Sequence, residues 1–246
     1  MAIELTINDR VATITLAKPE RRNSFDTRML ESMEDILTSI SREPTVDIVV
    51  LRAKGPAFCG GTDLKELASL DAKATLHWQR RTSALVERWA RLDATTITVY
   101  QGAAVGSGAI IGLASDLRIA TTDTWFQFPE VGHGIPLTWS GIQLLLRLVG
   151  ADMTKRLLLL QERLDANELE RLRLVVKVVS QENLDAALND MLQTLLKSSA
   201  LARSMCKHAI SAAASAPGFA TNELDPFLAS LSIYAQDRQA FTWDKS

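Results

Sequence analysis

The sequence has little cysteine, no excess of basic residues and no long apolar run, and each shortage excludes a class of protein. Its two cysteines, Cys59 and Cys206, cannot build a disulfide framework, and neither lies at metal-ligand spacing from a histidine. Lysine plus arginine number 27 against 29 for aspartate plus glutamate, so no basic field attracts nucleic acid or an anionic membrane. We therefore expect no disulfide, no metal site and no nucleic-acid partner.

The sequence also shows no pattern typical of an export signal or of a membrane span. No stretch reaches the roughly 18 apolar residues of a membrane span, and charged residues interrupt the opening segment MAIELTINDRVATITL. Linkers rich in proline, glycine or serine are also absent. The sequence predicts a soluble, unprocessed, cytoplasmic protein without membrane contact.

Strand and helix patterns alternate along the chain, which indicates an α/β fold with a helical C-terminal region. β-Branched residues at every second position predict a hairpin that turns at Asn8-Asp9, and Asp26 is placed to cap the first helix. The expected strands are residues 3–7, 11–17, 47–53, 97–102, 117–121 and 174–180. The expected helices are residues 26–42, 74–92, 140–149, 151–160, 165–172 and the tail from 182 onward.

Glycine is concentrated at two strand-to-helix junctions, AFCGGTDLKEL (57–67) and GAAVGSGAIIG (102–112). Glycines at such junctions let the backbone turn sharply, and the first N–H groups of the next helix then have no partner. Two N–H groups that converge on one oxygen stabilise negative charge on a carbonyl. Tight helix packing is the alternative explanation for either stretch alone.

Together with two further stretches, these junctions resemble the crotonase, or enoyl-CoA hydratase/isomerase, superfamily over nearly the whole chain. VATITLAKPERRNSF is similar to the family's opening strand and turn, and PAFCGGTDLKEL and QGAAVGSGAIIGLASDLRIAT are similar to its two oxyanion-loop motifs. FQFPEVGHGIPLTWSGIQLLLRLVG resembles the segment that delivers a catalytic glutamate. The resemblance implies a crotonase-like spiral of ββα units in residues 1–190, a helical trimerisation region in residues 191–246, and assembly as a homotrimer or hexamer. It also implies an acyl-CoA substrate and no further cofactor.

The resemblance assigns roles by position. The amides of Thr62 and Ser107 would hold the thioester oxygen, and Glu130 would be the acid/base. Serine stands at 107 where the family more often has glycine, and a main-chain donor survives that change if the local backbone accepts a Cβ. The predicted substrate contacts around these residues are Arg22, Cys59, Gly60, Gly61, Gly106, Ile110, Thr138 and Trp139.

One acid of the family's hydratases is replaced here. Those enzymes use two glutamates to hold and activate one water, and the first of the two positions is Ile110. Isoleucine neither orients water nor exchanges a proton, whereas Glu130 alone can remove a proton beside a polarised thioester and return it to another carbon. We therefore predict double-bond isomerisation of an enoyl thioester. A crotonase-type decarboxylase, a residual hydratase and a catalytically silent thioester-binding subunit are the alternatives.

Two further positions depart from relatives within the superfamily. Thr138 occupies roughly the position at which the family's dehalogenases carry a nucleophilic aspartate. A threonine cannot form the aryl ester that dehalogenation needs. The tail YAQDRQAFTWDKS (234–246) lacks the basic stretch that closes over CoA in many members. CoA and the phosphopantetheine of a carrier protein therefore both stay open as the acyl carrier.

Overall fold

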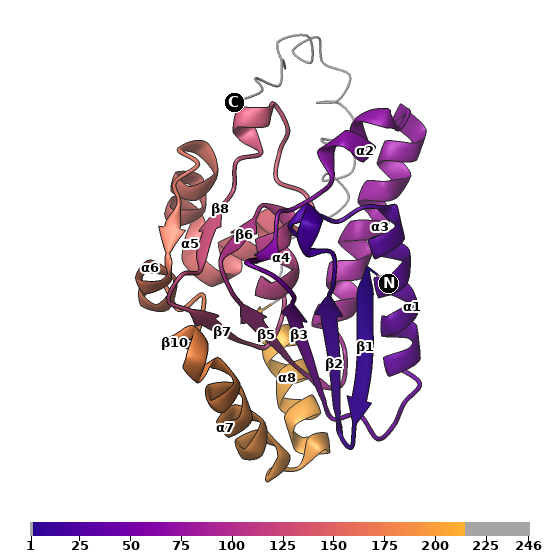
Figure 1. Ribbon diagram of the computed structural model, residues 1–246, viewed down its shortest axis with the longest axis vertical. Coiled ribbons are helices and arrows are strands. Elements are labelled where there is room, and N and C mark those ends of the chain that lie inside the picture. The colour runs from indigo at the N-terminus through magenta and orange to yellow at the C-terminus, as the bar shows by residue number, and fades with distance from the viewer. Residues whose placement is uncertain (1, 215–246) are drawn as a thin grey trace.

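The chain opens with the predicted hairpin, which starts a large sheet (Figure 1). β1 (Ile3–Asn8) and β2 (Val11–Leu16) pair antiparallel around Asp9, whose φ is 53°. Every second residue of β2 is buried, as the alternation of its sequence predicts. The computed structural model describes residues 2–214 of the chain.

Six strands form the large sheet, in the order β1-β2-β3-β5-β7-β10. All neighbours after the first pair are parallel. The added strands are β3 (Ile48–Ala53), β5 (Thr95–Tyr100), β7 (Leu117–Thr121) and β10 (Lys177–Val179). The predicted strand 174–180 is wrong in its first half, because Leu174 is held in a turn by a bond from its N–H to the Leu169 carbonyl.

A second sheet, in the order β4-β6-β8-β9, was not foreseen strand by strand. Its strands are β4 (Ala57–Cys59), β6 (Ala103–Val105), β8 (Trp125–Gln127) and β9 (Leu164–Asp165). β4, β6 and β8 each follow a strand of the large sheet directly, so strand pairs repeat along the chain. Strands of two or three residues are too short to show an alternating pattern, which is why the sequence analysis missed them.

Helices complete each repeat and continue into the C-terminal region. α1 is capped by Asp26, whose side chain accepts a bond from the Met29 N–H, as predicted. The predicted helices 140–149 and 151–160 are the two helical halves of α5, and they are separated at Gly150, whose φ of 75° and ψ of 172° are not helical. The α-helices are α1 (Thr27–Ile40), α2 (Leu64–Ser69), α3 (Ala72–Ala90), α4 (Ser107–Leu113), α5 (Gly141–Leu159), α6 (Ala166–Arg171), α7 (Leu184–Leu196) and α8 (Ala200–Ala214). Short 3-10 helices occupy Pro19–Arg21, Val131–His133 and Gln181–Asn183.

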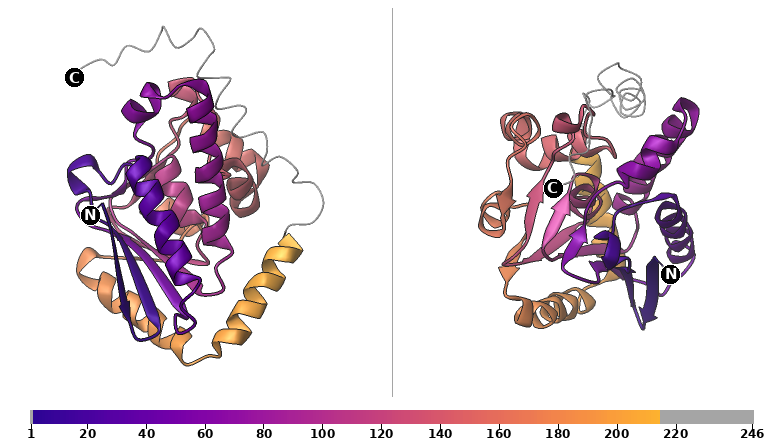
Figure 2. Two further views of the ribbon diagram at one scale, coloured as in Figure 1. Left: turned by 90° about the vertical axis from the view of Figure 1, so that its right-hand side faces the viewer. Right: turned by 45° about the horizontal axis from the view of Figure 1, so that its top comes forward.

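The large sheet carries a hydrophobic core on each face. Val49 and Leu51 of β3 belong to the main core with residues of α1, α3 and α4, whereas Ile48 and Val50 pack in a second cluster with Leu184 of α7. α7 is therefore part of the packed body, and the predicted boundary between residues 190 and 191 falls inside this helix. Figures 1 and 2 show α7 and α8 together at one end of the molecule.

Candidate active site

The segments that follow β4 and β6 pack backbone against backbone. A Cβ added to Gly61 would lie 2.8 Å from the Val105 carbonyl oxygen, and one added to Gly108 would lie 2.5 Å from the Cys59 carbonyl oxygen. Both distances are shorter than real Cβ contacts, so larger residues at 61 or 108 would force the segments apart. The two glycine-rich junctions of the sequence thus come into direct contact in the fold.

The predicted donors, Thr62 and Ser107, lie next to each other in this contact. Their hydroxyl oxygens, Thr62 Oγ1 and Ser107 Oγ, are 3.0 Å apart. Within residues 2–214, neither backbone amide is bonded to an acceptor. Ser107 begins α4, and the left-handed φ of 53° falls on the preceding Gly106, so the serine Cβ meets no backbone strain. Both amides are free to serve as main-chain donors.

The Glu130 carboxyl group lies against the start of α4. A Cβ on Gly106 would overlap Glu130 Oε1, so only glycine leaves room for the carboxyl there. Although the residue as a whole is partly exposed, Glu130 Oε2 is inaccessible to solvent and has no hydrogen-bond partner among the described residues. Burial raises the pKa of Glu130 from 4.5 to about 7. A carboxyl group with that pKa can take up and return a proton near neutral pH.

Ile110, at the position of the hydratases' first glutamate, belongs to the apolar core. The Ile110 side chain is fully buried in α4, and its Cδ1 lies 3.0 Å from a Cβ position on Gly141. Leu137 closes the same space. α4 carries no acidic residue, so a second carboxylate is absent from the helix that follows the second donor.

The turn before α5 is strained and holds two predicted substrate contacts. Trp139 (φ 60°) and Ser140 (φ 56°) are both left-handed, which is unusual for a bulky side chain. The buried Trp139 ring packs edge-on against Phe25, with centroids 5.1 Å apart, while Thr138 is half-buried. Phe25 pairs in turn with Thr62 through a backbone bridge. Trp139 thus supports the first donor, and its contact with substrate stays a prediction, as does that of Thr138.

Arg22 lies beside the first donor segment and is exposed. Its carbonyl oxygen accepts a 2.7 Å bond from the Gly60 N–H, and its φ is 51°. The neighbouring Arg21 bonds Asp63 at 2.8 Å, which raises the pKa of Arg21 through that hydrogen bond and charge. Arg21 is thus engaged by Asp63, and the contact of the exposed Arg22 with a ligand phosphate stays a prediction.

Asn23 braces the first donor segment from below, a role that the sequence analysis did not assign. This buried side chain donates from Nδ2 to the carbonyl oxygens of Lys54 (3.0 Å) and Ala57 (2.9 Å). The backbone carbonyl oxygen of Asn23 accepts a 3.1 Å bond from the Cys59 thiol. Burial raises the pKa of Cys59 to about 12, so this cysteine fills space and is no nucleophile. The sequence signal that could have indicated this role is Asn23 itself, which belongs to the stretch ERRNSF that resembles the family's opening turn.

The glycines of the second junction serve a sharp turn at one position and close packing at others. Gly106 provides the turn at the site, whereas Gly108 and Gly112 allow α4 to pack closely. A Cβ on Gly112 would collide with the hydroxyl of Tyr100, which donates a 2.7 Å bond to the Ala109 carbonyl oxygen. This tyrosine fixes α4 from the sheet side, and nothing in its sequence context predicted that contact.

Three remaining predictions concern features away from these loops. Residues 2–214 contain no group of three or more His, Cys, Asp or Glu side chains that could hold a metal ion. No helix in that part of the chain has the length and apolar character to cross a membrane. The segment 234–246, where CoA closure was considered, lies outside the described residues.

Known proteins resemble this chain in sequence and in structure. The sequence model of the family "Enoyl-CoA hydratase/isomerase" matches residues 6–240. A short-chain-enoyl-CoA hydratase of Clostridium acetobutylicum is 29% identical over 202 residues, covering 82% of this chain and 77% of that protein. A crotonyl-CoA hydratase of Syntrophomonas wolfei is 31% identical over 187 residues, covering 74% of this chain and 70% of its own length.

A solved structure supports the same assignment. A probable enoyl-CoA hydratase from Mycobacterium thermoresistibile superposes with a TM-score of 0.84 at 26% identity, covering 94% of this chain and 96% of the other. Because the match covers nearly the whole of both chains, the expected crotonase-like α/β fold is confirmed. The chain belongs to the enoyl-CoA hydratase/isomerase family of the crotonase superfamily.

Proposed function

We propose that this chain isomerises an enoyl thioester with a single carboxylate, Glu130, as the proton carrier. The observation that carries the proposal is the packing of the Glu130 carboxyl against Gly106, directly before the Ser107 donor. Its pKa of about 7 supports proton transfer in both directions. Membership in the family supports an acyl-CoA ester as the substrate.

The proposed reaction moves one proton from the α-carbon to the γ-carbon, and substrate and product have the same composition. The ionised Glu130 carboxylate removes an α-proton, and the electron pair of that C–H bond moves through the conjugated system onto the thioester oxygen. The amides of Thr62 and Ser107 would donate hydrogen bonds to this oxygen and stabilise its negative charge. Neutral Glu130 then returns the proton to the γ-carbon, which shifts the double bond and restores the carboxylate.

The apolar environment of Ile110 supports isomerisation over hydration. Adding water requires a group that orients the water molecule, and the buried isoleucine side chain supplies no donor or acceptor. The relatives named above are hydratases, so hydration is the second candidate. It would need another group to hold the water beside Glu130.

The proposal needs no group beyond the thioester itself. Arg22, exposed next to Gly60, is the cation that we propose for a phosphate of CoA or of carrier-protein phosphopantetheine. Both carriers present the same pantetheine arm to the site. A titration of the protein with free CoA and with 4′-phosphopantetheine separates them, because both offer the phosphate next to the pantetheine arm and only CoA offers the additional phosphates and the adenosine.

We also propose that the protein is cytoplasmic and assembles as a trimer or hexamer. Its two cysteines are unpaired, which suits a reducing compartment. α8 exposes Leu201, Met205 and Ile210 to 71%, 64% and 68%, and contact with another copy would bury them. A mass near the 27.0 kDa of one chain by light scattering at micromolar concentration would contradict the assembly.

A panel of CoA esters tests the reaction directly. Purified protein is incubated with 3-enoyl-, 2-enoyl- and malonyl-type CoA esters, and the acyl chain is followed by mass spectrometry and NMR. We expect 3-enoyl and 2-enoyl esters to interconvert without a change of mass. Water addition would favour a hydratase, loss of CO2 a decarboxylase, and binding without turnover a silent subunit.

A further inference from the structure

The two residues proposed as oxyanion donors also contact each other through their side chains. The 3.0 Å bond between Thr62 Oγ1 and Ser107 Oγ joins positions that are 45 residues apart in the chain. Among the described residues, it is the only side-chain hydrogen bond between segments 59–63 and 105–109. Ser107 is 5% exposed, so water has little access to its half of the bond.

The strands that lead into the two segments, β4 and β6, are hydrogen-bonded to each other as far as the pair Cys59 and Ala104. Beyond that pair, the remaining contacts between the two segments are close packing of backbone. Gly61 lies against the Val105 carbonyl, and Gly108 lies against the Cys59 carbonyl. Such contacts limit how near the segments can come, because atoms repel at short distance. They do not limit how far the segments can separate. A hydrogen bond supplies that second limit, since it weakens as its atoms move apart.

We propose that the Thr62 and Ser107 hydroxyls form a bridge that holds the two backbone amides at the separation needed to bind one thioester oxygen. The inference rests on the proposed function, in which those amides stabilise the enolate. Two donors serve one oxygen only if each N–H lies about 2.7–3.1 Å from it. Thr62 and Ser107 are therefore positioning residues through their side chains, in addition to their amides.

The test compares variants that remove a hydroxyl with one that keeps it. Thr62→Val and Ser107→Ala break the bridge but leave both amides, whereas Thr62→Ser retains a hydroxyl at the same Cβ. The probe is butyryl-CoA labelled with ¹³C at the carbonyl, whose stretching frequency falls when the bound oxygen accepts strong hydrogen bonds. Infrared difference spectra report this frequency without any turnover, since the acyl chain is saturated.

We expect wild type and Thr62→Ser to shift the carbonyl frequency alike, and Thr62→Val and Ser107→Ala to shift it less. Turnover of a 3-enoyl-CoA should fall roughly tenfold in both bridge-breaking variants, mainly in kcat, because the donors matter most when charge develops. The double variant should lose no more than either single variant, since each change breaks the same bond. Ser69→Ala, which removes an exposed hydroxyl on α2, is the matched control and should change neither measurement.

Failure of the bridge and failure of the proposed function give different results. A wild-type carbonyl shift that Thr62→Val and Ser107→Ala leave unchanged would overturn the bridge alone, as would losses that add in the double variant. No carbonyl shift in the wild-type protein would overturn the proposed function and the bridge with it. Ser107→Ala only removes an atom, so it provides the test even if valine at 62 prevents folding.

Discussion

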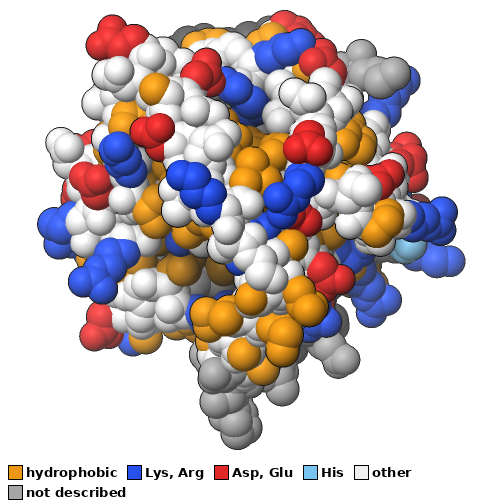
Figure 3. Space-filling view, turned by 90° about the horizontal axis from the view of Figure 1, so that it is seen from below, with side chains coloured by type: hydrophobic (Ala, Val, Ile, Leu, Met, Phe, Trp, Pro, Cys, Tyr) orange, Lys and Arg blue, Asp and Glu red, His pale blue; other side chains and the backbone are white. Residues whose placement is uncertain are grey.

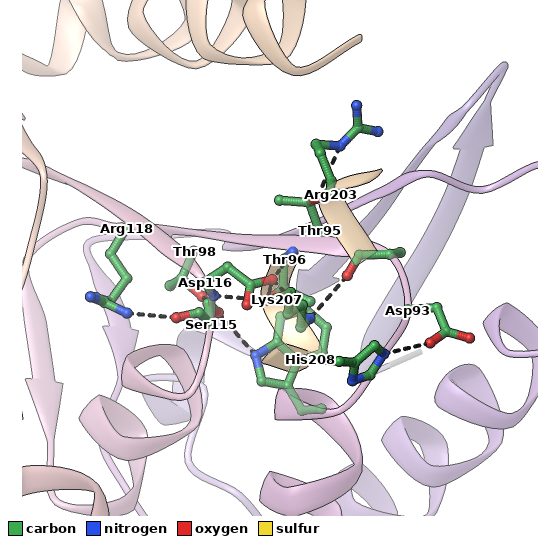
Figure 4. Close-up of polar contacts among 12 residues, drawn as sticks. Asp93, Thr95, Thr96, Thr98, Ser115, Asp116, Arg118, Arg203, Lys207 and His208 are labelled. Carbon is green, nitrogen blue, oxygen red and sulfur yellow. Dashed lines mark hydrogen bonds and ion pairs between the residues drawn. The ribbon is translucent and has the colours of Figure 1, made fainter. Parts of the chain in front are cut away.

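The two ends of the strands are held in different ways. At the carboxyl ends, the site is built from backbone packed on backbone, with Gly61 and Gly108 as the close contacts. At the amino ends, α8 is attached through charged side chains. Lys207 pairs with Asp116 at 2.8 Å, His208 with Asp93 at 2.8 Å, and Arg203 donates to the Thr95 hydroxyl at 3.2 Å. Figure 4 shows these residues at the start of α8 and the strand ends that they meet.

We propose that this difference separates chemistry from assembly within one chain. All residues of the predicted site fall between positions 22 and 139 of the sequence, so none of them belongs to α8. α8 instead exposes apolar side chains. Figure 3 shows hydrophobic side chains gathered at the end of the molecule where α7 and α8 lie, and the exposed Leu201, Met205 and Ile210 belong to α8. The expected C-terminal trimerisation region stays a prediction, to which this surface gives a physical reason.

The largest expected effect is at the carboxyl end. Glu130→Gln keeps the shape of the side chain but cannot accept a proton, so turnover of a 3-enoyl-CoA should fall by roughly 10²–10⁴ while CoA-ester affinity stays near wild type. Glu43→Gln, near the amino end of β3, is the control and should keep turnover within about twofold. Equal losses in both variants would break the separation between the two ends.

The pH dependence of stability sharpens the contrast next. The pKa of Glu130 in the folded protein is raised to about 7 from 4.5, so its stabilising contribution is complete below pH 4.5 and is lost as pH rises through 7. Wild type should therefore lose up to roughly 3 kcal/mol in the free energy of unfolding relative to Glu130→Gln between pH 5 and 9. Urea denaturation at a series of pH values measures this difference. Parallel curves for the two proteins would mean that Glu130 is not buried as described.

A smaller effect is expected from restoring the second acid. Ile110→Glu should raise water addition to a 2-enoyl-CoA by about tenfold or more, because a carboxylate there could hold the attacking water. Ile110→Gln is the control, since an amide orients water but cannot exchange its proton. If folded Ile110→Glu hydrates no faster than wild type, the absent glutamate is not the only feature that hydration lacks.

The smallest effect is at the amino end. Lys207→Met removes a mostly buried ion pair with Asp116, so the free energy of unfolding should fall by about 1 kcal/mol without a change in kcat. The exposed pair of Lys155 and Asp152 is the control, and Lys155→Met should cost close to nothing. A lower kcat in Lys207→Met would show that α8 acts on the site after all.

The fold could be predicted where the chain repeats a pattern over several residues. Strands β2, β3, β5 and β7 and the capped helix α1 are long enough for burial to leave a period in the sequence. β4, β6 and β8 are not, although they are the strands that position the site. Their existence followed only from the family resemblance.

The sequence could predict which residues of the candidate site come together, but not the side-chain contacts that hold them there. Glycines at two junctions indicated a close backbone approach, and the structure brings Thr62, Ser107 and Glu130 together. The brace by Asn23 and the bond from Tyr100 to α4 depend on contacts between distant segments, which leave no local pattern. The Thr62–Ser107 bridge was hidden for the same reason.

Exchange of the α-proton tests the central claim most directly, because it reports on proton abstraction even when the acyl chain of the natural substrate is not known. Wild-type protein and Glu130→Gln are incubated with a CoA ester in D2O, and deuterium at the α-carbon is followed by NMR. We predict exchange by wild type and a loss of roughly 10²–10⁴ in its rate in Glu130→Gln. Equal exchange by the two proteins would contradict the account, because the base would then have to be a group other than Glu130.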